Sequence, residues 1–209
     1  KLIVLAATAA VIALSLPWFR SDPRSGEYYT LLLFSALGAV LLAGATDLKQ
    51  FVVSMLLSSA TGYVLTAYHR LSRASAEAGI KYFLLGALTS ASMLIGVAYL
   101  FGMGGTTTLP GLRTGLSSED GIGLAVASAL VIVAVAFKLG AVPAHAWMPD
   151  VAEGAPAPVA AFVTSVPKVG AFLFLARLVV VLPADGLGWR PLVAVIAAAT
   201  MTLGNLAAL

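Results

Sequence analysis

Long apolar runs alternate with short polar connections along the whole chain. Seven such runs cover residues 2–18, 28–46, 50–68, 80–103, 121–143, 156–182 and 191–209. Each is close to the roughly 20 residues that an α-helix needs to cross a bilayer. The runs are rich in Ala, Leu and Val and do not alternate polar and apolar positions, as the strands of a membrane barrel would. The sequence therefore predicts an all-α, polytopic membrane protein with about seven transmembrane helices.

The connections carry turn and charge signals, and they separate no soluble segment. Residues 19–27 contain Pro23 and Gly26, residues 69–79 read HRLSRASAEAG, and residues 102–120 form the longest polar stretch. Gly and Pro in such positions mark turns. We expect residues 1–209 to fold as a single transmembrane helical domain. Because the chain begins without Met and stops inside an apolar run, we also expect it to be a fragment of a longer membrane chain.

Composition supports a membrane protein and excludes several other classes. Of the 209 residues, 60% are hydrophobic and 10% are charged, whereas soluble domains carry about 25% charged residues. The net charge of +3 is spread over short loops, so it indicates membrane orientation and no nucleic-acid partner. With no cysteine and two histidines, the chain is expected to bind no cofactor or metal of its own.

Basic residues in alternate loops favour one orientation. The first, third and fifth loops hold five of them, against four on the other side: Arg20, Arg24, Arg70, Arg73 and Lys81, against Lys1, Lys49, Arg113 and Arg190. The densest cluster, between Arg70 and Lys81, is placed on the cytoplasmic side, because cytoplasmic loops are enriched in Lys and Arg.

Small residues are abundant within the apolar runs, as in SSATG at residues 58–62 and GALTSAS at residues 86–92. Small side chains let helix backbones approach closely in lipid, so we interpret them mainly as packing surfaces. The alternative is that Ser58, Thr61, Ser90 and Ser92 line a hydrated path.

Two lysines, Lys138 and Lys168, lie inside apolar runs and away from their ends. A lysine at the bilayer centre costs about 2.5–3.5 kcal/mol on insertion scales. Burial disfavours the charged amine and a nearby acid favours it, so a lysine balanced between the two effects can take up and release a proton. The alternative is a lysine that reaches the interface or pairs statically with a carboxylate or carbonyl.

The segment around Lys138 is too long for one upright helix. Residues 121–153 are mostly apolar, with Gly140 and Pro143 near the middle. Proline lacks the N–H that continues a helix. We therefore predict a helix, a break near residues 138–143, and a second helix, with Lys138 beside the break. Transporters build ion sites from such broken helices. A simple kink followed by an interfacial segment is the alternative.

Two further residues extend this candidate site. Pro167 precedes Lys168 and leaves the carbonyl of Val163 without its usual donor, which places a polar group near the lysine. His145 follows Lys138 by seven residues and lies on roughly the same face if the second helix is continuous. Its ordinary pKa near 6.5 suits a proton relay between the lysines. A structural hydrogen bond of His145 is the alternative.

The acidic residues near the break are interpreted as mainly structural. Asp150 and Glu153 lie among prolines, in what we predict to be a re-entrant or interfacial turn where they cap or are solvated. Glu77 and Lys81 suit an i,i+4 pair at a helix N-terminus, which could also shape a proton access route. Arg177 is close enough to the end of its run to reach the interface.

Several stretches together resemble one known family. AFKLGAVPAHAWMPDVAEGAPAPVAAFVTSVPKVGAF, YYTLLLFSALGAVLLAGATDL, SAEAGIKYFLLGALTSA and MTLGNLAAL are similar to the antiporter-like subunit N (subunit 2) of proton-pumping NADH–quinone oxidoreductase, respiratory complex I. The resemblance covers roughly residues 28–209. It implies a longer bundle containing a pair of inverted repeats, of which this chain would hold the first and its flanks.

The resemblance also implies roles and surroundings. Lys138 corresponds to the central proton carrier of the broken helix, Lys168 to its relay partner, and His145 to a residue of the hydrophilic axis that connects them. The expected partners are other membrane subunits of a respiratory complex, the lipid bilayer and protons. NADH, FMN, iron–sulfur clusters and quinone would be bound by partner subunits. The expected location is the inner (cytoplasmic) membrane of a bacterium.

One departure from the family affects function. The family usually has a glutamate that pairs with the broken-helix lysine, and here the corresponding position falls near Leu56 in a stretch without acids. Pro167 stands where the family tends to have a small polar residue. The leading hypothesis is proton translocation through buried lysines and water, coupled to quinone reduction elsewhere. The alternatives are a cation/proton antiporter module, or a degenerate scaffold subunit that does not pump.

Overall fold

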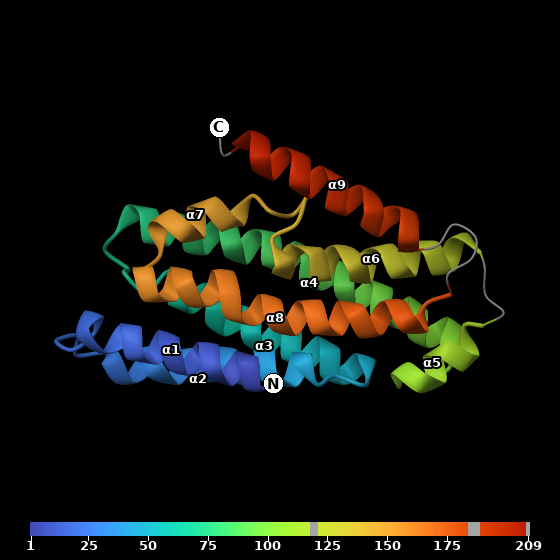
Figure 1. The fold of residues 1–209 in the computed structure, drawn as a ribbon, viewed down its shortest axis with the longest axis horizontal. Helices are drawn as coiled ribbons and strands as arrows, with labels where there is room; N and C mark the ends of the chain where they lie inside the picture. The colour runs from blue at the N-terminus through green and yellow to red at the C-terminus, as the bar shows by residue number, and fades with distance from the viewer. Residues whose placement is uncertain (118–120, 184–188, 208–209) are drawn as a thin grey trace.

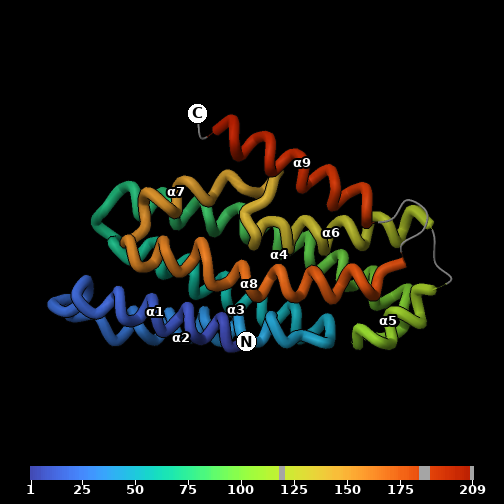
Figure 2. Tube along the Cα trace, viewed as in Figure 1, coloured from blue at the N-terminus to red at the C-terminus, as the bar shows by residue number. Residues whose placement is uncertain are grey.

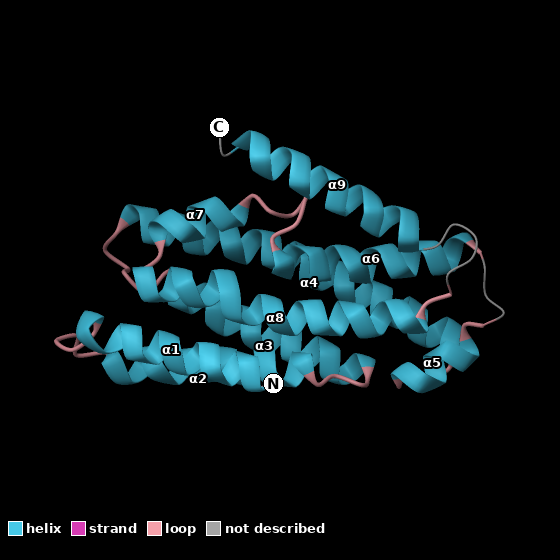
Figure 3. Ribbon diagram, viewed as in Figure 1, coloured by secondary structure: helices cyan, strands magenta, loops and turns pink. Residues whose placement is uncertain are grey.

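The computed structural model describes residues 1–117, 121–183 and 189–207, and these residues form nine helices. Figure 3 shows helices joined by loops, and the β-structure of the described residues is a single bridge between Asp47 and Thr108. The helices are α1 (Leu2–Trp18), α2 (Ser25–Ala43), α3 (Leu48–Thr66), α4 (Arg73–Gly104), α5 (Leu109–Gly115), α6 (Ile122–Leu139), α7 (Trp147–Gly154), α8 (Ala157–Val181) and α9 (Trp189–Ala207).

The seven predicted apolar runs each contain a helix. Within the described residues, six helices (α2, α3, α4, α6, α8 and α9) are long and apolar enough to cross a membrane, and α1 is slightly short at 17 residues. Residues 208–209 of the last predicted run and residues 118–120 of the long polar stretch lie outside the described residues. The sequence did not predict α5, which lies within that polar stretch.

The helices lie side by side along the long axis of the molecule (Figure 1). α2 packs against α3 and α8, while α4 packs against α3, α6 and α7. α6 and α7 follow one another along the same side of the bundle, and α6 ends near the middle of the bundle's long axis (Figure 1). α9 packs on α6 and has no buried residues, so it forms an outer helix of the described bundle.

Small residues bring the helices together, as the sequence predicts. A Cβ atom added to Gly38 of α2 would lie 2.7 Å from the backbone nitrogen of Ser58 in α3, so a larger residue would push these helices apart. Thr61 and Ser92 donate hydrogen bonds to carbonyls one turn back in their own helices. These two hydroxyls are therefore occupied by the backbone, which favours packing over a hydrated path at their positions.

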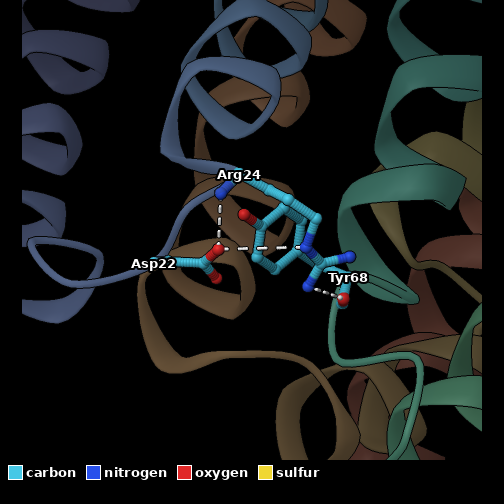
Figure 4. Close-up of polar contacts among 3 residues, drawn as sticks. All are labelled: Asp22, Arg24 and Tyr68. Atoms are coloured by element: carbon cyan, nitrogen blue, oxygen red, sulfur yellow. Dashed lines mark hydrogen bonds and ion pairs between the residues drawn. The ribbon is translucent and has the colours of Figure 1, made fainter.

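At one end of the bundle the α1–α2 and α3–α4 connections meet (Figure 4). The Arg24 guanidinium lies 4.7 Å from the centre of the Tyr68 ring, and its backbone N–H donates to the Asp22 carboxylate at 2.8 Å. Burial and the nearby Asp22 carboxylate raise the pKa of Tyr68 to about 12. The Tyr68 phenol therefore stays neutral at physiological pH and acts as a packing surface for the arginine.

At the other end, the α2–α3 connection is tied to the segment before α5. The Leu48 N–H donates to the Thr107 carbonyl at 2.8 Å, and the Leu109 N–H donates to the Thr46 carbonyl at 2.9 Å. Burial acts to raise the pKa of Asp47, but hydrogen bonds from the Thr107 hydroxyl and the Lys49 N–H outweigh it and lower that pKa. Asp47 is thus an ionised N-cap of α3.

Candidate functional site

The predicted helix break lies between α6 and α7, where the chain turns out of line (Figure 2). α6 ends at Leu139, and Gly140 adopts the left-handed conformation with φ +74°. Its N–H donates to the Phe137 carbonyl at 3.0 Å, and the Ala141 N–H donates to the Ala136 carbonyl at 2.8 Å. This is the glycine-terminated C-cap expected of a helix end. The break therefore begins at Gly140, three residues before Pro143.

The segment after the break agrees with the prediction in one way and differs in two. Trp147–Gly154 is the predicted second helix, although we had interpreted the stretch around Asp150 as a turn; Pro149 is tolerated because it falls within the first turn of this helix. His145 lies in the non-helical connection before α7. The expectation that it shares a helical face with Lys138 is therefore wrong, because the chain is not helical between Gly140 and Ala146.

Trp147 fixes the start of α7 against the end of α6. Its indole N–H donates to the Phe137 carbonyl at 3.1 Å, and its ring stacks on Tyr82 of α4 at 4.3 Å between centroids. The side chain is fully buried. The carbonyl it binds belongs to the residue before Lys138, so Trp147 holds the last turn of α6 in place.

Replacing Trp147 with Phe should destabilise the protein by about 0.5–1.5 kcal/mol, because the Phe137 carbonyl loses one of its two donors and keeps the Gly140 N–H. The measurement is the thermal unfolding midpoint of the purified protein in detergent. Phe172→Leu is a matched control, since Phe172 is an exposed aromatic residue of α8. A midpoint as high for Trp147→Phe as for that control would show that this hydrogen bond does not hold the break.

Lys138 lies in the last turn of α6 and is 1% exposed. Its ammonium donates to the Ser59 hydroxyl of α3 at 3.0 Å. The ion pairs among the described residues involve Arg24 and Lys81. No carboxylate oxygen of the described residues therefore lies within 4 Å of the Lys138 amine. The amine is therefore held deep inside the bundle by a neutral hydroxyl, where a charge is costly unless it is paired or hydrated.

Leu56, at the position where the resemblance led us to expect an acid, is 39% exposed. Ser59 follows it by three residues on the buried side of α3. The group that meets Lys138 is therefore this hydroxyl. We had not included Ser59 among the candidates, although it belongs to the SSATG stretch; its neighbour Ser58 was named instead.

Lys168 is half-buried in α8, directly after the internal Pro167. Its amine contacts the Met148 sulfur at 3.0 Å. A thioether is a weak acceptor, and among the described residues the amine makes no ion pair. Lys168 therefore faces α7 and the break, and its contact is a methionine where we expected a carbonyl near Val163.

A cavity of about 430 Å³ adjoins the break. Its lining comes from the break, α7 and α9: Gly140, Val142, His145, Met148, Pro149, Ala152, Thr200, Gly204 and Ala207. The Nδ1 atom of His145 is buried and makes no hydrogen bond within the described part of the chain. The Thr200 hydroxyl accepts a hydrogen bond from the Val142 N–H at 3.0 Å. The lining is mostly apolar, and the buried His145 Nδ1 atom is the group that offers a water molecule there a hydrogen bond.

Met148 connects this cavity to Lys168, since it lines the cavity and contacts the lysine amine. The structure thus brings His145, Lys168 and the break together. Lys138 points to α3 and is not among the residues that line the cavity.

The predicted pair of Glu77 and Lys81 is present, with 2.6 Å between the amine and the carboxylate. The Lys81 amine also lies 2.8 Å from Asp150 in α7. Asp150, which we expected to cap or to be solvated, instead pairs across helices, because α4 and α7 pack together. Glu153 is exposed, as expected. Arg177 donates to the Ala45 carbonyl at 3.1 Å, which is a structural contact.

Asp150→Asn should change stability by less than about 1 kcal/mol, because the pair is partly exposed and such pairs contribute little. Glu77→Gln should have a still smaller effect, because Glu77 is the more exposed of the two acids. Unfolding midpoints of the two variants in detergent measure both effects. A loss of several kcal/mol for either variant would contradict this assignment.

The described residues contain no group of three or more His, Asp or Glu side chains that could hold a metal ion. The titratable groups near the break include the amines of Lys138 and Lys168 and the imidazole of His145. What these groups can do chemically is bind and release protons in a largely buried setting.

Comparison with known proteins gives consistent results. The model of the family described as "NADH:quinone oxidoreductase/Mrp antiporter, TM" matches residues 45–209. The chain is 44% identical over 209 residues to NADH-quinone oxidoreductase subunit N 1 of Streptomyces griseus, covering all of this chain and 44% of that protein. It is 46% identical over 189 residues to subunit N of a Mycobacterium species, covering 90% of this chain and 40% of that protein.

The fold of this chain also matches chains of two solved respiratory complexes. A chain of respiratory complex I from Thermus thermophilus matches with a TM-score of 0.77 and 34% identity, over 98% of this chain and 45% of that one. A chain of an archaeal membrane-bound sulfane sulfur reductase matches with a TM-score of 0.80 and 28% identity, over 92% of this chain and 40% of that one. The chain thus spans less than half the length of the relatives that it matches.

Proposed function

Because the chain belongs to the NADH:quinone oxidoreductase/Mrp antiporter family of transmembrane proteins, we propose that it translocates protons as a membrane subunit of NADH–quinone oxidoreductase. The predicted all-α membrane fold and the predicted family are both confirmed. In this proposal, quinone reduction in partner subunits drives the proton movement, and NADH, FMN and iron–sulfur clusters are bound there. The bacterial relatives favour the inner membrane as its location.

The observation that carries the proposal is the environment of Lys138. Its amine is buried near the middle of the bundle, beside the break, and a single hydroxyl accepts its hydrogen bond. In such a site the ammonium is favoured only while water or a passing charge is close, and the neutral amine is favoured otherwise. Changes of hydration driven from outside the chain can therefore load and unload the proton.

Lys168 and His145 extend the route on the other side of the break. Water in the cavity beside His145 would connect its unpaired Nδ1 atom to the region of Lys168, with Met148 between them. A proton leaving the Lys168 amine can then pass through water to the His145 imidazole, whose Nδ1 atom makes no hydrogen bond within the described residues.

Two rival functions predict different results. In a cation/proton antiporter, translocation would depend on sodium, and intramembrane acids would favour such a site. In a scaffold subunit, translocation would not depend on Lys138, and the leucine at position 56 favours this reading. The test is NADH-driven proton uptake by sealed vesicles that contain the full complex, with and without sodium, for the unaltered chain and Lys138→Ala. Sodium-independent uptake that requires Lys138 supports the proposal.

A further inference from the structure

A second hydroxyl lies on α3, one turn beyond the one that holds Lys138. Tyr63 follows Ser59 by four residues, so the two side chains lie on the same face of the helix. The Tyr63 hydroxyl is buried and makes no hydrogen bond within the described residues. Its ring packs edge-on against Tyr82 of α4, with 4.7 Å between centroids. This phenol is held in the interior with its hydrogen-bonding capacity unused, which is uncommon for a buried polar group.

α4 leaves a space for this hydroxyl. The Tyr63 hydroxyl lies against Gly86, where any side chain would overlap it. Ser90 follows Gly86 by four residues on the same face of α4, and the hydroxyls of Ser59 and Ser90 lie beside that of Tyr63. Three hydroxyl groups therefore gather between α3 and α4, and one of them contacts Lys138.

Tyr63 also reaches the outer face of the bundle. It lines a groove of about 430 Å³ between α3 and α4, whose other lining residues are Val64, Ala67, Arg70, Ala76, Gly79, Ile80 and Phe83. The groove is open and lies toward the end of the bundle where α3 and α4 are connected. Tyr63 is thus the residue that borders both the buried hydroxyls and this open groove.

We propose that Tyr63 is a proton-transfer residue that connects Lys138 to the groove between α3 and α4. This inference rests on the function proposed above and names a route for the same lysine. In this route a water molecule bridges the Ser59 and Tyr63 hydroxyls, because the buried Tyr63 hydroxyl has no hydrogen-bond partner among the described residues and is free to bind one.

The transfer is balanced and needs no ionised tyrosine. The Lys138 ammonium gives a proton to the Ser59 oxygen as Ser59 gives its own to the bridging water. The water passes one proton to the Tyr63 oxygen, and Tyr63 releases its own proton to a water molecule that enters from the groove and reaches its buried hydroxyl. Lys138 ends as a neutral amine, each hydroxyl ends neutral, and one proton has moved. This route uses only uncharged hydroxyl groups. It therefore requires no acid at position 56, where this chain has leucine.

The test is Tyr63→Phe in the full-length chain within the intact complex in sealed vesicles. We expect proton translocation per unit time to decrease roughly tenfold, which corresponds to about 1.4 kcal/mol on the barrier. The phenylalanine keeps the packing against Tyr82, so the unfolding midpoint should be almost unchanged. Tyr68→Phe is the matched control, because the Tyr68 hydroxyl is also buried and unpaired but lies at the end of the bundle. It should translocate protons normally.

Each outcome decides a separate point. If Lys138→Ala stops translocation and Tyr63→Phe leaves it unchanged, the Tyr63 route is wrong and the proposed function stands. Equal decreases for Tyr63→Phe and Tyr68→Phe would show a general structural effect and would also overturn the route. If Lys138→Ala translocates normally, the proposed function itself fails.

Discussion

Replacing Lys138 with alanine in the intact complex is expected to abolish proton translocation or to reduce it sharply. The reason is that the Lys138 amine is a fully buried titratable group beside the break, with the Ser59 hydroxyl as its hydrogen-bond acceptor. Removing it leaves an apolar gap that a proton can cross only at the cost of an unsolvated charge. Positioned proton-transfer groups contribute about 10²–10⁴-fold to rates, so we expect a loss of that order. NADH-driven proton uptake by vesicles measures it.

Lys49→Ala is the matched control for this result. Lys49 lies in the first turn of α3 and is exposed, so it can remain solvated in either state. The control should translocate protons at the rate of the unaltered complex. Translocation by Lys138→Ala at the control rate would favour the scaffold function instead.

A carboxylate in direct contact with the Lys138 amine at position 59, in contrast to an acid at the more exposed position of Leu56, should be almost as damaging as the loss of the lysine. In Ser59→Asp the new acid would replace the hydroxyl that now lies 3.0 Å from the amine. A buried ion pair is hard to separate, because each partner leaves the other as an unpaired charge. The ammonium would therefore keep its proton, and we expect translocation to fall about 100-fold, equivalent to about 2.7 kcal/mol.

Ser59→Asn separates the effect of charge from that of size. The amide has nearly the shape of the acid but carries no charge, so it should reduce translocation much less than Ser59→Asp in the same vesicle assay. Similar rates for the two variants would mean that an acid at this position does not trap the Lys138 proton.

The sequence predicted those features that depend on local chemistry. The apolar runs locate the helices because a bilayer-crossing helix must be apolar over most of its length. The break follows from Gly140 and Pro143, since a left-handed glycine ends a helix and a proline cannot continue it. The i,i+4 pair of Glu77 and Lys81 follows from helix geometry alone.

Contacts between helices were less predictable. Ser59 is the partner of Lys138 because of how α3 is rotated in the bundle, and nothing in the order of the serines in residues 58–62 sets that rotation. Asp150 pairs with Lys81 from 69 residues away, and such a pair has no periodic signature. The position of His145 was not predictable for a similar reason, because its placement on the face of Lys138 required a continuous second helix, and that helix begins only at Trp147.

The most direct measurement is the protonation state of the Lys138 amine, by nitrogen NMR of the membrane-embedded complex with isotope-labelled lysine. The Lys138 signal is identified by its loss in Lys138→Gln. We predict that it changes from ammonium to neutral amine within the pH range in which the complex translocates protons. A signal that stays ammonium across that range would show that Lys138 holds a fixed charge and carries no proton.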